Sequence, residues 1–172
     1  LFNSQDLTTN NEVILANIFD MSKNRSQNVN GTVFGDYEQA PAKDLIQTYL
    51  MRDGSRFTDL PNYDKLSFVK EFQNRDPRLS QTMAYPGWIR VPDTKPYIQS
   101  LNKNFTGYHQ LKGYVNSTDA STLNGVDFPV YRYAEVLLSY AEALAELGTL
   151  KQQQLDVSVN LIRRRAGMPD LN

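Results

Sequence analysis

The clearest pattern of apolar and polar positions lies near the end of the chain, over residues 130–148. Polar side chains recur there at helical spacing and form one stripe: Glu135, Ser139, Glu142 and Glu146. Apolar side chains fill the remaining face: Ala134, Leu137, Leu138, Ala141, Leu144 and Ala145. This pattern predicts an amphipathic helix that ends at Gly148.

A second helical pattern follows over about residues 153–166, and Gly167 and Pro169 end it. The two helices together predict an antiparallel helical hairpin. Because the apolar stripes are too wide for one hairpin to bury, we expect the hairpin to pack on further helices.

Shorter signals occupy the first part of the chain. Residues 12–20 form an apolar run rich in β-branched side chains, which favours a buried strand. Residues 22–40 show no period and predict a long loop. From Pro41 to Gly54 a helix is predicted, because Pro41 suits a helix start and apolar residues recur at helical spacing after it. Those apolar residues are Ala42, Leu45, Ile46, Tyr49 and Leu50.

Two more helices precede a long irregular segment. Residues 63–73 carry four apolar side chains on one side, which predicts a helix there: Tyr63, Leu66, Val69 and Phe72. Asp76 and Pro77 predict a helix start, because Asp76 can accept free N–H groups and proline suits the first position. Proline and glycine then interrupt residues 85–125 repeatedly, while that segment carries many rings: Tyr85, Trp88, Tyr97, Phe105, Tyr108 and Tyr114. Such a segment predicts an ordered, ligand-facing loop region.

Composition excludes several classes of function. The chain has 172 residues, which suits one domain, and it has no cysteine and one histidine. Disulfides, thiolate zinc sites, cysteine nucleophiles and two-histidine metal centres are therefore excluded. Its 18 basic and 19 acidic residues balance, so no electrostatic footprint for nucleic acid stands out, and no apolar run is long enough to span a bilayer. The composition is rich in aromatic and amide side chains, with 19 aromatic residues, 15 Asn and 11 Gln. Such side chains suit neutral hydroxylated ligands.

Three features invite a catalytic or nucleic-acid interpretation, and each has a simpler structural one. Arg163, Arg164 and Arg165 point about 100° apart on a helix, so capping or ion pairing is favoured over a basic patch. The glutamates of the polar stripe are most simply solvated. His109 is interpreted as a surface or hydrogen-bonded residue. No nucleophile elbow, phosphate loop or metal-ligand spacing appears, so we predict no catalytic residue, metal or cofactor.

The candidate ligand-binding residues are rings in the irregular segment. Trp88 follows Tyr85-Pro86-Gly87, and it is either a core residue or a stacking platform on a rigid turn; the sequence leaves both open. A flat ring suits the C–H face of a sugar. Trp88 and Tyr85 are the first candidates, and Tyr97 and Tyr108 are secondary ones.

Five blocks of the sequence carry a family resemblance. They are Tyr131–Leu144, Ile162–Pro169, the strand Glu12–Phe19, the helix Pro41–Gly54 and the segment Asn74–Leu79. Taken in chain order, they resemble the C-terminal half of the RagB/SusD family. The resemblance implies a mainly α-helical fold with long irregular loops and a little β-structure, including a tetratricopeptide-like hairpin. It also implies a non-enzymatic outer-membrane lipoprotein of Gram-negative bacteria, which binds glycans or other nutrients for a TonB-dependent SusC-like transporter.

This resemblance sets the expected organisation of the chain. Residues 1–129 would form a loop-rich ligand-binding part and residues 130–172 the helical hairpin, both within one SusD-like domain truncated at both ends. A lipid anchor would lie outside this segment. The matching motifs are architectural and identify no ligand contact. Two alternatives remain open: a helical protein-interaction module, and a fragment of a glycan-active hydrolase with two carboxylates facing a cleft near Trp88.

Overall fold

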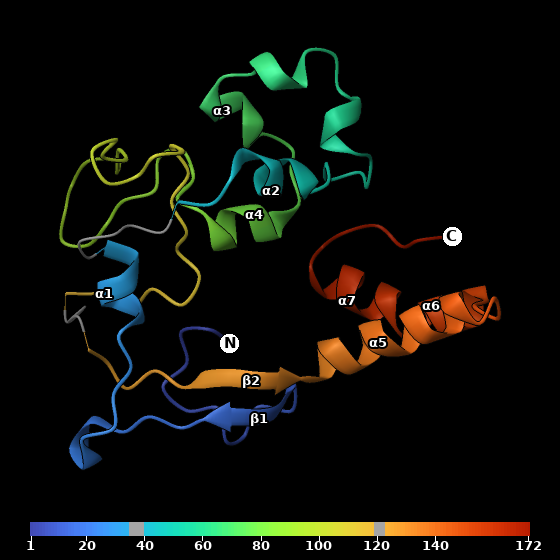
Figure 1. The fold of residues 1–172 in the computed structure, drawn as a ribbon, viewed down its shortest axis with the longest axis horizontal. Helices are drawn as coiled ribbons and strands as arrows, with labels where there is room; N and C mark the ends of the chain where they lie inside the picture. Colours follow the sequence, from blue (N-terminus) through green and yellow to red (C-terminus); the bar gives the residue numbers. More distant parts are fainter. Residues whose placement is uncertain (35–39, 119–122) are drawn as a thin grey trace.

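The computed structural model describes residues 1–34, 40–118 and 123–172 (Figure 1). A two-stranded sheet joins two distant parts of the chain, several short helices and long loops lie between the strands, and a helical hairpin ends the chain. The predicted fold class, mainly helical with long irregular loops and a little β-structure, is confirmed. No helix within the described ranges is long and apolar enough to cross a membrane.

The sheet pairs β1 (Val13–Asn17) with β2 (Phe128–Arg132) in antiparallel orientation. The strand predicted over 12–20 therefore exists, but its predicted burial is wrong: the side chains of Ile14 and Leu15 are 59% and 50% exposed. A two-stranded sheet has no third strand or second layer to cover both of its faces. β2 was not predicted, because its residues continue the apolar pattern of the helix that follows; that helix begins at Tyr133 rather than at residue 130.

The predicted loop 22–40 contains ordered elements. The 3-10 helix η1 (Met21–Lys23) overlaps its start, and α1 (Val29–Phe34) lies within it. α1 has only six residues, too few to show a helical period in the sequence. Val33 of α1 is completely buried, so the prediction of a loop is wrong here. Residues 35–39 lie outside the described residues.

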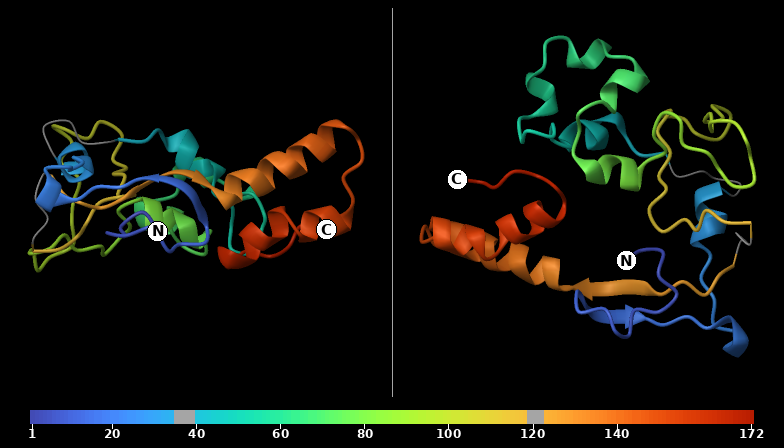
Figure 2. Two further views of the ribbon diagram at one scale, coloured as in Figure 1. Left: turned by 90° about the horizontal axis from the view of Figure 1, so that it is seen from below. Right: turned by 180° about the vertical axis from the view of Figure 1, so that it is seen from behind.

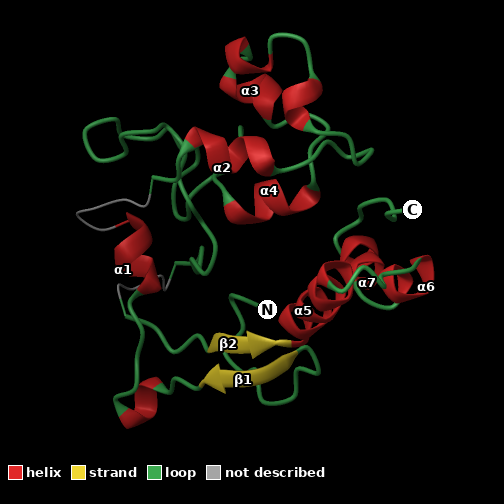
Figure 3. Cartoon of the chain, turned by 45° about the vertical axis from the view of Figure 1, so that its right-hand side comes forward, coloured by secondary structure: helices red, strands yellow, loops and turns green. Residues whose placement is uncertain are grey.

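The helices predicted over 41–54 and 63–73 are shorter than their patterns. α2 (Lys43–Thr48) ends before a turn at Gly54, whose φ of +90° suits glycine. Residues 63–73 form two separate pieces, the 3-10 helix η3 (Tyr63–Lys65) and α3 (Phe68–Glu71). A further 3-10 helix, η2 (Phe57–Asp59), precedes them. Figure 3 shows α2 and α3 near each other among loops. Ile46 of α2 is buried with Phe68 and Phe72 packed against its cluster, whereas Leu45 and Val69, which the helical patterns placed on the apolar sides, are exposed.

The predicted start of the next helix is confirmed. α4 (Pro77–Thr82) has proline at its first position, and the Asp76 carboxylate accepts a hydrogen bond from the Arg78 N–H at 2.9 Å. The same carboxylate binds the Arg78 guanidinium. Beyond α4, the described residues up to β2 contain no helix or strand, as predicted for residues 85–125; residues 119–122 lie outside the description.

Arg75 connects the ends of these short helices. Its side chain is buried, and the guanidinium lies 3.7 Å from the centre of the Phe57 ring. It donates four hydrogen bonds to backbone carbonyls, those of Glu71, Ile46, Tyr49 and Leu50, at 2.6, 2.7, 2.8 and 3.4 Å. The last carbonyls of a helix have no partner within the helix, so Arg75 satisfies groups at the ends of α2 and α3 together.

The helical hairpin is confirmed, with one interruption. α5 (Tyr133–Glu146) leads to α6 (Gln152–Asp156) and α7 (Val159–Arg165), and the chain returns along α5 (Figure 2). The single helix predicted over 153–166 is therefore broken between Asp156 and Val159. The apolar face of α5 is only partly covered: Ala134 and Ala141 are buried, whereas Leu138 is 48% exposed. The tetratricopeptide-like character of the hairpin stays a prediction.

The three consecutive arginines serve three different contacts, as predicted. Arg163 donates to the Pro169 carbonyl at 2.6 Å, and Arg164 pairs with Asp170 at 2.6 Å. Arg165 pairs with Glu12 beside β1. They stabilise the end of the chain and its contact with the sheet, and they form no common basic patch.

Replacing Arg75 by leucine should lower the free energy of unfolding by about 3 kcal/mol, because buried carbonyls lose their donor. Urea denaturation followed by circular dichroism measures the change. Arg25→Leu, at an exposed arginine, is the control and should change stability by less than about 0.5 kcal/mol. A loss below about 1 kcal/mol for Arg75→Leu would show that water replaces the guanidinium.

The Asp76 carboxylate should make stability depend on pH. Burial by itself raises the pKa of Asp76, but hydrogen bonds and charge from Arg78 outweigh burial and hold that pKa below 3.8. A depressed pKa in the folded state stabilises above pH 3.8, and this contribution is lost as the pH falls through the folded pKa. Asp76→Asn should therefore be less stable than the parent protein by about 1 kcal/mol at pH 7. The difference should shrink below about pH 4 in urea titrations; a constant difference would contradict this.

Candidate ligand-binding site

Rings from distant parts of the chain form what we call the aromatic cluster: Phe34, Trp88, Tyr97, His109 and Tyr114. The Trp88 ring lies 6.0 Å from the Phe34 ring with an angle of 9° between their planes. Tyr97 meets Trp88 edge-on at 5.6 Å, and His109 stacks on Phe34 at 4.4 Å. Offset-stacked and edge-on pairs are the favoured arrangements of aromatic rings. Two predicted site residues, Trp88 and Tyr97, thus lie together.

A tight turn positions Trp88. The Trp88 N–H donates to the Tyr85 carbonyl at 3.0 Å, which closes a turn through Pro86 and Gly87. Gly87 has a φ of +89°, which glycine adopts readily because it has no side chain. Pro86 occupies the position before it, where the fixed φ of proline suits a turn. The Trp88 carbonyl accepts from the Tyr97 N–H at 2.8 Å. The indole is half-buried and is therefore fixed by both its backbone and its neighbours.

His109 stabilises the aromatic cluster through hydrogen bonds made by both of its ring nitrogens. It is completely buried, and its Nε2 lies 2.7 Å from the Val33 carbonyl oxygen. Its Nδ1 pairs with the Tyr97 hydroxyl at 2.9 Å. The histidine thus joins α1 to the irregular segment, in agreement with the prediction of a hydrogen-bonded residue.

The other two predicted residues occupy different positions. Tyr85 begins the turn and is 41% exposed. Tyr108 is buried in a separate apolar cluster with Ile46 and Leu79, and its hydroxyl donates to the Glu71 carboxylate. Burial and this hydrogen bond raise the pKa of Tyr108. Tyr85 lies in the same turn as Trp88, and the Tyr97 ring contacts the Trp88 ring. Tyr108 lies in a different cluster.

Sequence reasoning missed two residues of the cluster and one at its edge. Phe34 lies in the stretch predicted as a loop, and Tyr114 was noted only as one ring among many. Arg90 places its guanidinium carbon 4.3 Å from the centre of the Phe34 ring, and its Nε lies 3.4 Å from the Tyr114 hydroxyl. Short segments without a period gave no signal that these side chains would meet.

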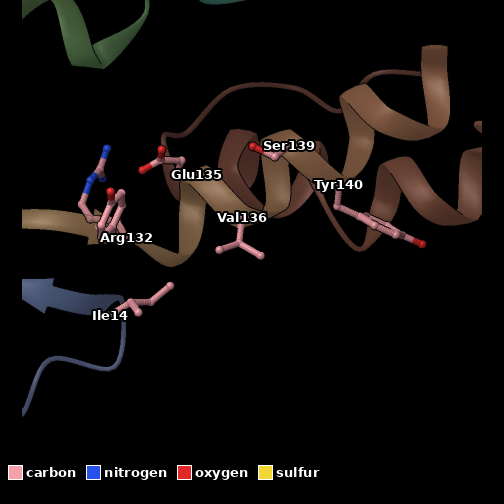
Figure 4. Close-up of a pocket in the computed structure, with 7 residues that line it drawn as sticks. Ile14, Arg132, Glu135, Val136, Ser139 and Tyr140 are labelled. Atoms are coloured by element: carbon pink, nitrogen blue, oxygen red, sulfur yellow. The ribbon is translucent and has the colours of Figure 1, made fainter.

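A second surface runs beside α5. A shallow groove of about 620 Å³ lies between Ile14 of β1 and the side chains of α5, among them Val136, Ser139 and Tyr140 (Figure 4). Four exposed apolar residues extend along this helix, and we call them the α5 apolar stripe: Tyr133, Val136, Tyr140 and Leu147. Their spacings of three, four and seven residues put them on one side of the helix, a pattern that the sequence analysis passed over.

A larger cleft of about 680 Å³ lies between α4 and the hairpin. Its arginines already have partners: Arg78 binds Asp76, while Arg132 and Arg165 share Glu12. Arg78 therefore stabilises the start of its own helix α4, and the pairs with Glu12 join the sheet to the hairpin. Within the described ranges, no group of three His, Asp or Glu side chains could hold a metal ion.

Comparisons with known proteins agree with this architecture. The sequence model of the SusD family matches residues 11–172. The chain is similar to a solved SusD-like carbohydrate-binding protein from Bacteroides fragilis, with 30% identity and a TM-score of 0.76, over 99% of this chain and 38% of that one. A second SusD-like protein from the same organism shares the fold, with 21% identity, a TM-score of 0.65, and coverage of 95% and 37%. The chain thus spans little more than a third of the length of these structures. No curated protein matches it.

Removing the Tyr97 hydroxyl should loosen the aromatic cluster. Tyr97→Phe keeps the ring but deprives buried His109 of a partner, so the free energy of unfolding should fall by about 1 kcal/mol. Urea denaturation measures this loss, and the exposed Tyr133→Phe is the matched control. Equal stability of the two variants would contradict the supporting role of His109.

Proposed function

The chain belongs to the SusD family, and from this premise we propose that it binds glycans and does not transform them. The aromatic cluster is the observation that carries the proposal. Trp88 is half-buried and is the last residue of a tight turn, and Tyr85, whose side chain is exposed, is the first residue of that turn. The C–H face of a sugar stacks on rings of this kind, and neighbouring polar groups can bind its hydroxyls.

Rigid placement of these rings supports binding more than their number does. Phe34 and Tyr97 pack against Trp88, and the turn fixes its backbone. A ligand that stacks there does not have to order the platform first, so little of the contact energy is lost to ordering. Each ring contributes about 0.5–1.5 kcal/mol beyond the area buried. A few such contacts give affinities of about micromolar to millimolar, which repeated units of a polymer can raise.

The two parts of the chain have different roles in this proposal. Residues 1–129 make the glycan contact through Trp88, Tyr85 and, at the edge, Tyr97, while residues 130–172 provide helical support. Tyr108 then has a structural role through Glu71. The wider role that we propose is delivery of the glycan to a TonB-dependent SusC-like transporter at the outer membrane of a Gram-negative bacterium. That role rests on the family alone.

A second candidate function is protein interaction, and the α5 apolar stripe favours it. Exposed apolar residues along one side of a helix, next to a groove, are typical of surfaces that contact another protein or another part of the same one. The two functions concern different faces and are compatible. Loss of glycan binding on substitution of Trp88 would count against protein interaction as the sole function.

Tyr85→Ala should weaken glycan binding without affecting the fold, because the Tyr85 side chain is exposed. The expected change is about threefold to tenfold, the effect of one stacked ring. Affinity electrophoresis through gels containing different polysaccharides measures it. Trp88 is the only tryptophan, so its fluorescence gives an independent signal of binding. Trp88→Phe, which keeps a ring against Phe34, should weaken binding more than Tyr85→Ala does.

The matched control is Tyr133→Ala, which removes a ring that is 51% exposed on α5. It should leave glycan binding unchanged. If no polysaccharide retards the parent protein, or if Tyr85→Ala and Trp88→Phe are retarded as strongly as the control, the proposed function is wrong.

A further inference from the structure

Arg90 differs from the other shielded arginines of the described chain. Five arginine side chains there are buried or half-buried: Arg75, Arg78, Arg90, Arg132 and Arg163. All except Arg90 donate to carboxylate or carbonyl oxygens. The terminal nitrogens of Arg90 donate to no described residue, and its Nε has only the long contact to Tyr114. A guanidinium has five N–H donors, so the four on the terminal nitrogens of Arg90 remain available to a ligand.

The position of Arg90 is fixed from both sides. Asn116 bonds its two chain neighbours, donating to the Ile89 carbonyl at 2.9 Å and accepting from the Val91 N–H at 2.8 Å. The guanidinium then lies over the Phe34 ring, whose other contacts include the nearly parallel ring of Trp88. Stacking on a ring holds a guanidinium while its edge stays free to donate. Arg90 is therefore placed at the rim of the aromatic cluster.

The irregular segment around Arg90 is locally basic. Over the whole segment, residues 85–125, the sequence has four basic residues, Arg90, Lys95, Lys103 and Lys112, and two acidic residues, Asp93 and Asp119, a net charge of +2. The whole chain has a net charge of −1, so the positive charge of this segment is not visible in the overall composition. Asp93 forms no ion pair with Arg90 in the described chain, although its N–H donates to the Arg90 carbonyl at 2.7 Å. Arg90 is the basic residue of this segment that lies against the aromatic cluster, so it brings positive charge to the cluster.

We infer that Arg90 selects acidic sugars at the proposed glycan site. Its guanidinium binds the paired oxygens of a carboxylate or a sulfate ester while the sugar ring stacks on Trp88. Carboxylates and other oxyanions form bidentate pairs with the planar N–H donors of arginine. Neutral hydroxyl groups do not form such pairs. This inference rests on the proposed glycan-binding function, and it changes the expected ligand from neutral to acidic.

Affinity electrophoresis with matched polymers tests the inference. The gels contain polygalacturonate or its carboxyl-reduced form, and a sulfated galactan or its desulfated form. At least one acidic polymer should retard the protein more than its neutral counterpart, and added salt should reduce that retardation. The carboxylate and the sulfate pairs distinguish the two sources of negative charge.

Variants then separate Arg90 from the rest of the site. Arg90→Gln should weaken binding of the acidic polymer about tenfold, the effect of a charged hydrogen bond. It should leave binding of the neutral counterpart unchanged. Arg90→Lys keeps the charge without the planar donors and should lie between Arg90→Gln and the parent. Arg25→Gln, at an exposed arginine outside the cluster, is the control, and Trp88 fluorescence checks that each variant is folded.

Each result decides between the two proposals. Equal retardation by acidic and neutral forms, retardation by neutral forms alone, or an Arg90→Gln variant that behaves like Arg25→Gln overturns the role of Arg90. In these cases the proposed function stands as long as Trp88→Phe weakens binding. Absence of retardation by any of the four polymers overturns this inference and counts against the proposed function as well.

Discussion

The buried guanidinium of Arg75 is the interaction on which the central part of this fold depends. Helices of four to six residues leave most of their terminal carbonyls without partners, and burying such groups is costly. Arg75 donates to four backbone carbonyls at and just beyond the ends of α2 and α3, and it stacks on Phe57. It thereby lets α2 and α3 pack together without long regular elements.

The same constraint explains the amides and carboxylates inside the loops. Asp127 accepts hydrogen bonds from the Leu7 and Phe19 N–H groups at 2.9 Å each, joining the start of the chain to the strand β2. Asn104 is completely buried and binds the backbone of Gly107 and Tyr108. Irregular backbone can be buried only if side chains satisfy it. The many Asn residues, interpreted first as ligand groups, therefore serve in part to hold the loops.

The groups that we propose for ligand binding are held by the order of these loops. Asn116 fixes the chain on both sides of Arg90, and a turn fixes Trp88, so a ring platform and a charged group lie on one stiff segment. The hairpin contributes differently. Its α5–α7 contact leaves the α5 apolar stripe exposed, and this is the face that we propose for contact with another protein. In our proposal, the loops bind the glycan and the helices contact protein.

The sequence by itself determined the elements whose signals are local. Helical periodicity identified α5 and its stop at Gly148, and the cap of α4 followed from Asp76 and Pro77 alone, because caps and amphipathic faces involve neighbours in sequence. The five matching blocks also identified the family. Only the tertiary structure decided which rings share a site: Phe34 and His109 join Trp88 from 54 and 21 positions away in the chain, while Tyr108 is buried elsewhere. Contacts between segments without a period depend on packing and on hydrogen bonds to distant backbone, and no local pattern records them.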